Sequence, residues 1–152
     1  MTAVSLKRIL VALWAVWLTF VLATNVFDAL KALGRLDESW RFASGNYNFL
    51  VATTARYSTP AWLNGLLFAG VIAWEGAAAA LFWVVWWLFR RPRDARKRWC
   101  YAAFASSLSL WLAFAIADEV FIAYAVEGTH LRLFTAQLVT LLTIELIPEG
   151  ER

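Results

Sequence analysis

The sequence has few of the residues from which metal and catalytic sites are usually built. Its 152 residues include one cysteine, Cys100, and one histidine, His130. A single cysteine excludes a disulfide within the chain, and one thiol with one imidazole cannot complete a typical zinc or haem site. The sequence also contains no phosphate-binding loop and no nucleophile elbow. We therefore expect a protein that is not an enzyme, binds no metal and has no intrinsic cofactor.

Charged residues are scarce as well. They make up 16% of the sequence and hydrophobic residues make up 62%, whereas soluble domains average about 25% charged and about 45–50% apolar residues. This composition is typical of a protein whose outer surface contacts lipid. The basic cluster in residues 90–98 separates two apolar runs and has no groove-reading motif beside it. It therefore indicates membrane topology and not a nucleic-acid partner.

Four long apolar runs predict four transmembrane helices, because about 20 apolar residues cross a bilayer. The first run follows Lys7 and Arg8 as the core of a signal peptide would, but we interpret it as a membrane helix. A short turn that contains His130 makes the last two helices an antiparallel hairpin. The predicted helices cover residues 9–27, 61–89, 99–126 and 131–147. The expected fold is an all-α membrane protein, a single antiparallel four-helix bundle over residues 1–152.

The segment between the first two predicted helices, residues 28–59, combines charges with many aromatic residues. It is too aromatic for a disordered linker. We expect it to fold over the outer ends of the helices as a cap that contains a short helix. The residues that mark this outer cap are Asn25, Asp28, Trp40 and Arg41.

Basic residues also set the expected orientation. Lys7, Arg8, the cluster in residues 90–98 and Arg152 fall on one side of the predicted bundle. Cytoplasmic loops carry an excess of Lys and Arg. We therefore expect both termini in the cytoplasm and the cap on the outside.

One charged residue lies inside the apolar run of residues 61–89. Glu75 should lie roughly 21 Å below the outer start of its helix at 1.5 Å per residue. That depth is near the bilayer midplane, where a charge costs at least a few kcal/mol. No cation is expected at this depth, and the candidate partners are Ser109, Trp14 and Trp17. Glu75 is then either a neutral, hydrogen-bonded link between helices or a carboxylate that relays protons or binds a cation.

Further polar residues are expected nearer the outer surface. Glu119 should lie roughly 10 Å below the outer end of the third helix, at the depth of Gln137 in the fourth. We expect Glu119 to pair with Gln137 or with Arg132 at the rim. The alternative is a polar pocket that opens outward, built from Asp118, Glu119, Gln137, Asn25 and Asp28.

Small and hydroxyl-bearing residues indicate how the helices pack. Small residues at four-residue spacing let membrane helices approach closely, and the second predicted helix has two such lines. They are Ala69, Ala73 and Ala77 on one line and Gly76 with Ala80 on the other. We therefore expect this helix at the centre of the bundle. Thr140, on the polar stripe of the fourth helix, is interpreted as bonding its own backbone.

Several short motifs lie in or near these elements. They are Asn25 and Asp28, Trp40-Arg41, Ala73-Trp74-Glu75, Ala79-Ala80-Leu81, and Glu119 with Phe121. Together they resemble an uncharacterised family of bacterial predicted small integral membrane proteins, a four-helix domain of unknown function. The chain departs from the family pattern at residues 123–129, where the family has Trp, Gln and Asn. The resemblance implies four helices, a capped outer loop and a bacterial cytoplasmic membrane location, and it implies no activity.

These observations lead to two functional hypotheses. The first is a non-catalytic structural or accessory subunit of a larger membrane complex, such as an electron-transfer or photosynthetic assembly. Its partners would be the bilayer and other membrane subunits, with lipid, quinone or pigment contacts where they meet. The alternative is a small transporter or proton-coupled module that uses intramembrane carboxylates such as Glu75.

Overall fold

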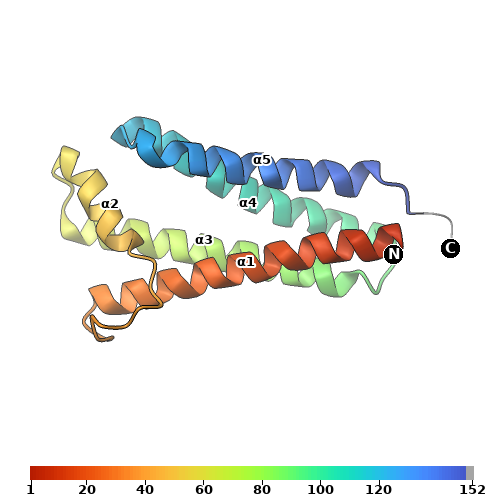
Figure 1. Ribbon diagram of the computed structural model, residues 1–152, viewed down its shortest axis with the longest axis horizontal. Helices are drawn as coiled ribbons and strands as arrows, with labels where there is room; N and C mark the ends of the chain where they lie inside the picture. The colour runs from red at the N-terminus through yellow and green to blue at the C-terminus, as the bar shows by residue number, and fades with distance from the viewer. Residues whose placement is uncertain (150–152) are drawn as a thin grey trace.

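The computed structural model describes residues 1–149, and this part of the chain is helical without a strand (Figure 1). Arg152, which the sequence analysis placed with the cytoplasmic residues, lies outside the described residues. The elements in chain order are α1 (Ala3–Ala32), α2 (Asn46–Thr54), the 3₁₀ turn η1 (Ala55–Tyr57), α3 (Ala61–Leu88), α4 (Arg93–Phe121) and α5 (Tyr124–Leu146).

Three of the helices, α1, α3 and α4, are long and apolar enough to cross a membrane. The prediction of four such helices is therefore confirmed only in part. The fifth helix, α5, is not among them, although its 23 residues could reach across a bilayer. Its polar residues explain the difference, because Arg132, Gln137 and several threonines interrupt its apolar positions.

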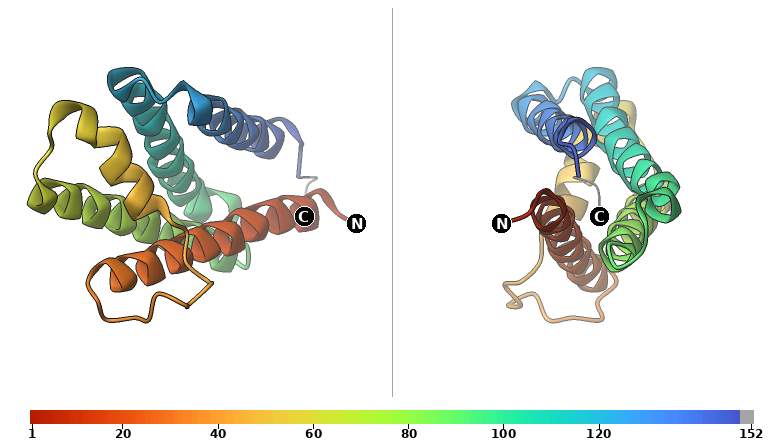
Figure 2. Two further views of the ribbon diagram at one scale, coloured as in Figure 1. Left: turned by 60° about the vertical axis from the view of Figure 1, so that its left-hand side comes forward. Right: turned by 90° about the vertical axis from the view of Figure 1, so that its right-hand side faces the viewer.

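The helices pack in chain order around α3. Helix α3 lies between α1 and α4, α5 packs mainly on α4, and contacts between α1 and α5 are few (Figure 2). The core is apolar and aromatic, and the rings of Phe82 and Phe104 meet edge to face at 4.9 Å. The prediction that residues 61–89 form the central helix is therefore confirmed, and this helix is α3.

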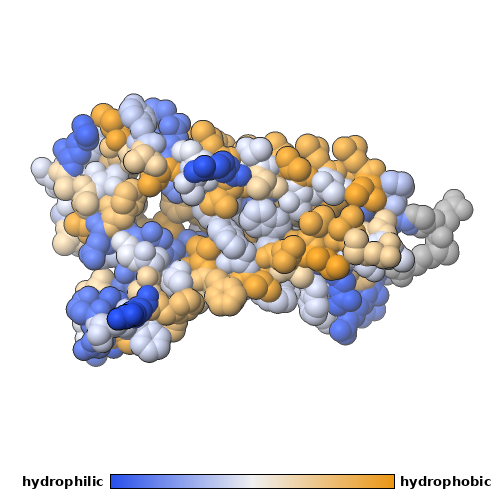
Figure 3. Space-filling model, in the orientation of Figure 1, coloured by the Kyte–Doolittle hydropathy of each residue, from blue (hydrophilic) through white to orange (hydrophobic). Residues whose placement is uncertain are grey.

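The two ends of the bundle differ in character. At the cap end, α2 and the connecting loops lie across the ends of α1 and α3 (Figure 1). At the basic end, the start of α1 meets the loop between α3 and α4 and the segment after α5. Hydrophobic surface covers much of the length between the ends, and hydrophilic surface gathers at the ends (Figure 3). With three apolar spans, this distribution is typical of an integral membrane protein.

The helices extend beyond the membrane spans predicted from the sequence, and α1 already begins at Ala3 and not at residue 9. For the end of α1, the helical spacing and the glycine in residues 27–36 allow either a continuation out of the membrane or a separate short helix, and the structure has the continuation. Helix α1 continues beyond residue 27 to Ala32 and ends before Gly34, which has φ of 64°, a left-handed conformation that glycine adopts without strain. Helix α4 begins at Arg93, directly after Pro92, instead of at residue 99. Proline is favoured immediately before or at the first position of a helix, because its missing N–H has no helical partner there.

The turn between the last two helices also lies earlier than predicted. Helix α4 ends at Phe121 instead of residue 126, and only Ile122 and Ala123 separate it from α5. The backbone N–H of Ala123 donates to the carbonyl of Asp118 at 2.7 Å, which closes the end of α4. Gly128, whose presence suggested a turn at residues 127–130, is helical in α5. The antiparallel hairpin remains, but its position along the chain was predicted wrongly.

Candidate functional site

The most buried carboxylate in the described chain, that of Glu75, joins α3 to α1. The side chain of Glu75 is 2% exposed, and both its oxygens accept hydrogen bonds of 2.8 Å from the amide of Asn25, which is 1% exposed. This contact was not predicted from the sequence, from which Ser109, Trp14 or Trp17 were expected as partners. Asn25 was assigned to the outer cap because α1 was expected to end at residue 27, whereas α1 continues and keeps Asn25 inside the bundle.

The contact continues into the cap. The carbonyl oxygen of Asn25 accepts a hydrogen bond of 2.8 Å from the amide of Asn46, at the start of α2. The backbone N–H of Asn46 donates to the hydroxyl of Ser44, and this hydroxyl donates to the carboxylate of Asp28 at 3.2 Å. Glu75, Asn25, Asn46, Ser44 and Asp28 therefore form one connected set, which we call the cap network.

The cap network also fixes the first turn of α2. The same oxygen of Asp28 accepts a bond of 2.7 Å from the backbone N–H of Tyr47. A carboxylate suits the N-terminus of a helix, because backbone N–H groups there have no helical partners. Asp28 is 6% exposed. The Tyr47 ring packs on Phe68 of α3 at 5.5 Å, so the network and this aromatic contact hold α2 against both α1 and α3.

The arrangement favours a fixed link over a relay. Among residues 1–149, no Lys, Arg or His forms an ion pair with Glu75. The first two groups that follow it, Asn25 and Asn46, are carboxamides, which donate and accept hydrogen bonds but pass protons poorly compared with carboxyl or imidazole groups. The network joins three helices, and breaking its buried Asn25–Glu75 contact would leave buried polar atoms without partners.

A second polar contact joins α4 to α5 near the cap end. The carboxylate of Asp118, 5% exposed, lies 2.5 Å from Nδ1 of His130. The imidazole also stacks on Trp111 and packs against Phe114, at 6.5 Å and 5.0 Å between ring centres. His130 was expected in an exposed turn, and that expectation is wrong because the turn lies at Ile122 and Ala123.

The pairs predicted for Glu119 are not formed. Glu119 is exposed on α4, next to Asp118, which takes the inward position. Gln137 is fully buried, yet neither its amide nitrogen nor its oxygen has a hydrogen-bond partner among the described residues. The hydroxyl of Ser107 and the indole N–H of Trp111 are likewise buried without a partner. The predicted outward pocket is not assembled, because Asp118 pairs with His130, whereas Asn25 and Asp28 belong to the cap network.

The remaining polar residues of the interior have ordinary structural contacts. The hydroxyl of Thr140 donates to the backbone of Ala136 at 2.8 Å, as the sequence analysis expected, and accepts from the indole of Trp14 at 3.1 Å. This second contact links α1 to α5. Ser109 is exposed on α4 and makes no contact with Glu75.

The small residues of α3 lie mostly on its outer face. Ala69, Ala73, Ala77 and Ala80 are exposed, and Gly76 is half-buried, with side-chain atoms of Leu22 at 3.8 Å from a Cβ built there. The residues that α3 buries are on its opposite face, among them Phe68, Glu75, Ala78, Ala79, Phe82 and Val85. The close approach predicted along Ala69, Ala73 and Ala77 is therefore not made within the described chain.

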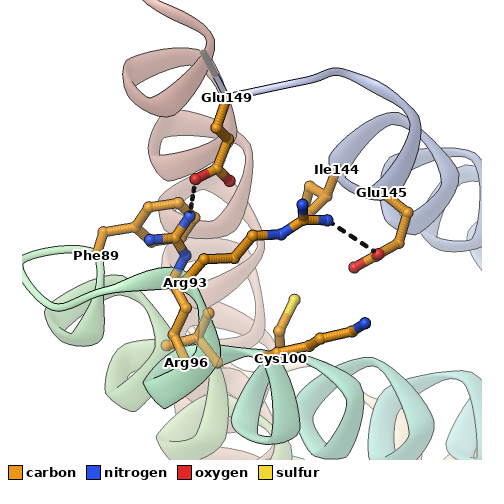
Figure 4. Close-up of a pocket in the computed structure, with 9 residues that line it drawn as sticks. Phe89, Arg93, Arg96, Cys100, Ile144, Glu145 and Glu149 are labelled. Atoms are coloured by element: carbon orange, nitrogen blue, oxygen red, sulfur yellow. Dashed lines mark hydrogen bonds and ion pairs between the residues drawn. The ribbon is translucent and has the colours of Figure 1, made fainter. Parts of the chain in front are cut away.

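An ionic cluster closes the basic end (Figure 4). The carboxylate of Glu149 accepts a hydrogen bond of 3.0 Å from Lys7 of α1. It also accepts one from Arg96 of α4. Arg93 pairs with Glu145 at 3.5 Å. Burial acts to raise the pKa of Glu149, but the hydrogen bonds and charges of Arg96 and Lys7 outweigh it and lower this pKa below its ordinary value. The segment after α5 is thereby tied to α1 and α4.

Cys100 lies beside this cluster. It is 4% exposed and lines a cavity of about 20 Å³, which has room for no more than about one water molecule. The burial of Cys100 fits an ordinary packing residue, because a buried thiol is inaccessible to modification such as acylation.

The cap residues Trp40 and Arg41 line a larger hollow of about 400 Å³ with Asp28 and Lys31. Trp40 packs on Phe27 at 5.4 Å, and its indole donates to the carbonyl of Phe42 at 3.1 Å. Lys31 bonds the carbonyl of Glu38 at 2.8 Å and pairs with its carboxylate at 3.4 Å. These contacts give the aromatic loop a defined path across the end of α1.

Within the described residues, no group of three or more His, Cys, Asp or Glu side chains could hold a metal ion. Comparisons of the chain with known protein families, with curated proteins and with solved structures find no match. The resemblance to a family of small bacterial membrane proteins stays a prediction.

Proposed function

We propose that this protein is a non-catalytic accessory subunit of a larger membrane assembly. In this proposal α5 crosses the membrane together with α1, α3 and α4, and both termini lie in the cytoplasm of a bacterium, because the basic end carries most of the Lys and Arg residues. The partners are other membrane subunits, such as those of an electron-transfer or photosynthetic complex.

The observation that carries the proposal is the outer face of α3. Ala69, Ala73, Ala77 and Ala80 are exposed along it, and bulkier exposed residues, Trp62 and Trp87, lie towards its two ends. Without a hydrophobic driving force in lipid, helix association depends on close packing, which small residues permit. A face of this kind that the bundle itself leaves uncovered suits a helix of a neighbouring subunit.

The sparse packing of α5 supports the same proposal. Only Gln137 and Ile144 of its residues are buried, and it contacts α1 little. A helix with several polar side chains is better accommodated between protein neighbours than in lipid. A neighbouring subunit would also supply contacts for exposed tryptophans such as Trp74 and Trp83, either directly or through a lipid, quinone or pigment.

Replacement of Ala73 by leucine tests the proposal. The larger side chain would hold a partner helix away from α3 while remaining compatible with lipid, so the assembly should dissociate and the isolated chain should keep its melting temperature. Ala105→Leu is the matched control, since Ala105 is exposed on α4 outside the small-residue face. Equal retention of the partner subunits by both variants would contradict the proposal.

The alternative, a small transporter or proton-coupled module, rests on the buried carboxylate of Glu75. It predicts that Glu75→Gln abolishes ion-dependent transport in proteoliposomes and leaves stability and assembly intact. The accessory-subunit proposal predicts that the wild type shows no such transport and that Glu75→Gln lowers stability or assembly, because the carboxyl then serves to join α1 and α3. Measuring both properties on the same variant separates the two functions.

A further inference from the structure

An open apolar hollow of about 470 Å³ lies at the cap end, between the α2–η1 segment and the turn that joins α4 to α5. It is separate from the cap network and from the outer face of α3. Its lining residues are Phe49, Ala52, Thr53 and Arg56 on one side and Phe121, Ile122, Ala123 and Ala125 on the other.

The polar residues of the hollow are gathered on one wall. Thr53 and Arg56 are three positions apart, at the end of α2 and in η1, and the opposite wall is entirely apolar. Arg56 is exposed and takes part in none of the ion pairs that residues 1–149 form. The lining therefore pairs an available guanidinium and a hydroxyl with a hydrocarbon surface.

Contacts beside the hollow join its two walls to each other. The hydroxyl of Tyr57 donates to the carbonyl of Val120 at 2.7 Å, and the Tyr57 ring packs on Phe121 at 5.5 Å. These contacts connect η1 directly to the end of α4. Because both are made by residues beside the hollow, its shape is formed before any ligand arrives.

Ile122 gives a reason to expect a ligand. Its backbone lies in the left-handed region, with φ of 56° and ψ of 45°, where a β-branched residue is strained and glycine is not. Burial of the side chain does not offset this strain, because the side chain is 47% exposed. An isoleucine at a glycine position, with its side chain directed at the hollow, is explained if the side chain contacts something that occupies the hollow.

We propose that the hollow binds one glycerophospholipid, with an acyl chain against Phe49, Phe121 and Ile122 and the phosphodiester at Arg56 and Thr53. A guanidinium binds phosphate oxygens through paired hydrogen bonds, and an apolar wall removes hydrocarbon from water. The surroundings favour a lipid over a protein segment. Tyr57 and Tyr124, both more than half exposed beside the hollow, are the residue type enriched where a membrane meets water.

Native mass spectrometry of the full chain in a phosphate-free detergent, titrated with phosphatidylglycerol, tests this proposal. The wild-type protein should retain one lipid. Arg56→Gln should weaken its binding by about tenfold, which is the effect of losing one charge-assisted contact, and Ala52→Trp should abolish it by filling the hollow. Arg35→Gln is the matched control, because Arg35 is an exposed cap-end arginine outside the hollow, and it should bind as the wild type does.

A fourth variant separates lipid binding from folding. Ile122→Gly should bind the lipid more weakly although its melting temperature is equal to or above that of the wild type, because the substitution relieves the backbone strain. The proposal is overturned if Arg56→Gln and Arg35→Gln bind alike, if Ala52→Trp still retains the lipid while folded, or if the hollow is protected by a partner chain and not by phosphatidylglycerol. None of these results depends on whether the protein is an accessory subunit.

Discussion

At the scale of single residues, the contact between Glu75 and Asn25 is the most consequential. A carboxylate inside a membrane helix is costly to keep there, and this one receives both its side-chain hydrogen bonds from a single amide. Asn25 in turn receives a bond from Asn46 of the cap. The Asn25 side chain therefore bonds two neighbours at once, Glu75 of α3 and Asn46 of α2.

Replacing Asn25 with alanine should destabilise the protein. Glu75 would keep its burial and lose its donor, and an unsatisfied buried group costs about 1–3 kcal/mol. Unfolding in mild detergent measures the effect, with Asn48→Ala as the control, because Asn48 is exposed on α2 and outside the cap network. A loss of stability no larger than that of Asn48→Ala would show that the contact does not join the helices.

For Ile122 we predict the opposite change in stability. Ile122→Gly should stabilise the isolated protein by about 1 kcal/mol, because the strain of a left-handed β-branched residue is of this order or somewhat larger. The control is Ile116→Gly, in the exposed middle of α4, which should destabilise by about 1 kcal/mol through helix propensity. Equal losses of stability for the two variants would mean that Ile122 is unstrained.

At the scale of elements, the segment after α5 is tied to the bundle by charge. Glu149 has a lowered pKa in the folded protein, so in the acidic range below its ordinary value of 4.5 the unfolded chain binds the additional proton. The stability that its pairs with Lys7 and Arg96 contribute is therefore present above that range. It is lost as the pH falls through the lowered folded pKa.

Glu149→Gln makes this prediction measurable. The variant should melt below the wild type near neutral pH, and the difference between the two should shrink as the pH falls through the lowered folded pKa of Glu149. Glu38→Gln is the control, since the Glu38 side chain is 86% exposed and its pair with Lys31 should contribute little. A difference that stays constant across the acid range would contradict the assigned role of Glu149.

The elements also show which parts of the fold the sequence could predict. Apolar runs and basic flanks located α1, α3 and α4, and the aromatic content of residues 28–59 predicted a folded cap with a short helix, which is α2. The turn before α5 was misplaced because Gly128 is the stronger sequence signal, whereas the chain turns at Ile122, a residue unsuited to that conformation. The backbone preferences of the residues in this segment oppose a turn at Ile122, so they could not predict it.

The candidate site was predicted less completely for the same reason. A hydrogen-bonded link through Glu75 was one of its two predicted roles, whereas its depth in the bilayer stays a prediction. Its partner was not found, because the charge at Asp28 suggested that α1 stops near residue 27. Asp28 instead accepts a hydrogen bond from the backbone N–H of Tyr47 and is covered by the cap. Asn25 is an interior residue because α1 continues past it and packs on α3, and Asp28 is one because the cap covers it.

At the scale of the whole molecule, the described chain leaves three surfaces uncovered: the small-residue face of α3, most of α5, and the hollow beside Ile122. Its buried polar contacts, in contrast, hold helices and cap together. A rigid bundle with an uncovered small-residue face is suited to join larger neighbours. This combination is the physical basis of the proposal that the protein is an accessory subunit.

The measurement that tests this account most directly is the mass of the particle released from the native membrane in mild detergent, for the wild type, Ala73→Leu and Ala105→Leu. We predict that the wild type and Ala105→Leu carry other membrane subunits in fixed ratio, and that Ala73→Leu is released alone with an unchanged melting temperature. A wild-type protein that is released alone, or an Ala73→Leu variant that keeps its partners, would contradict the account.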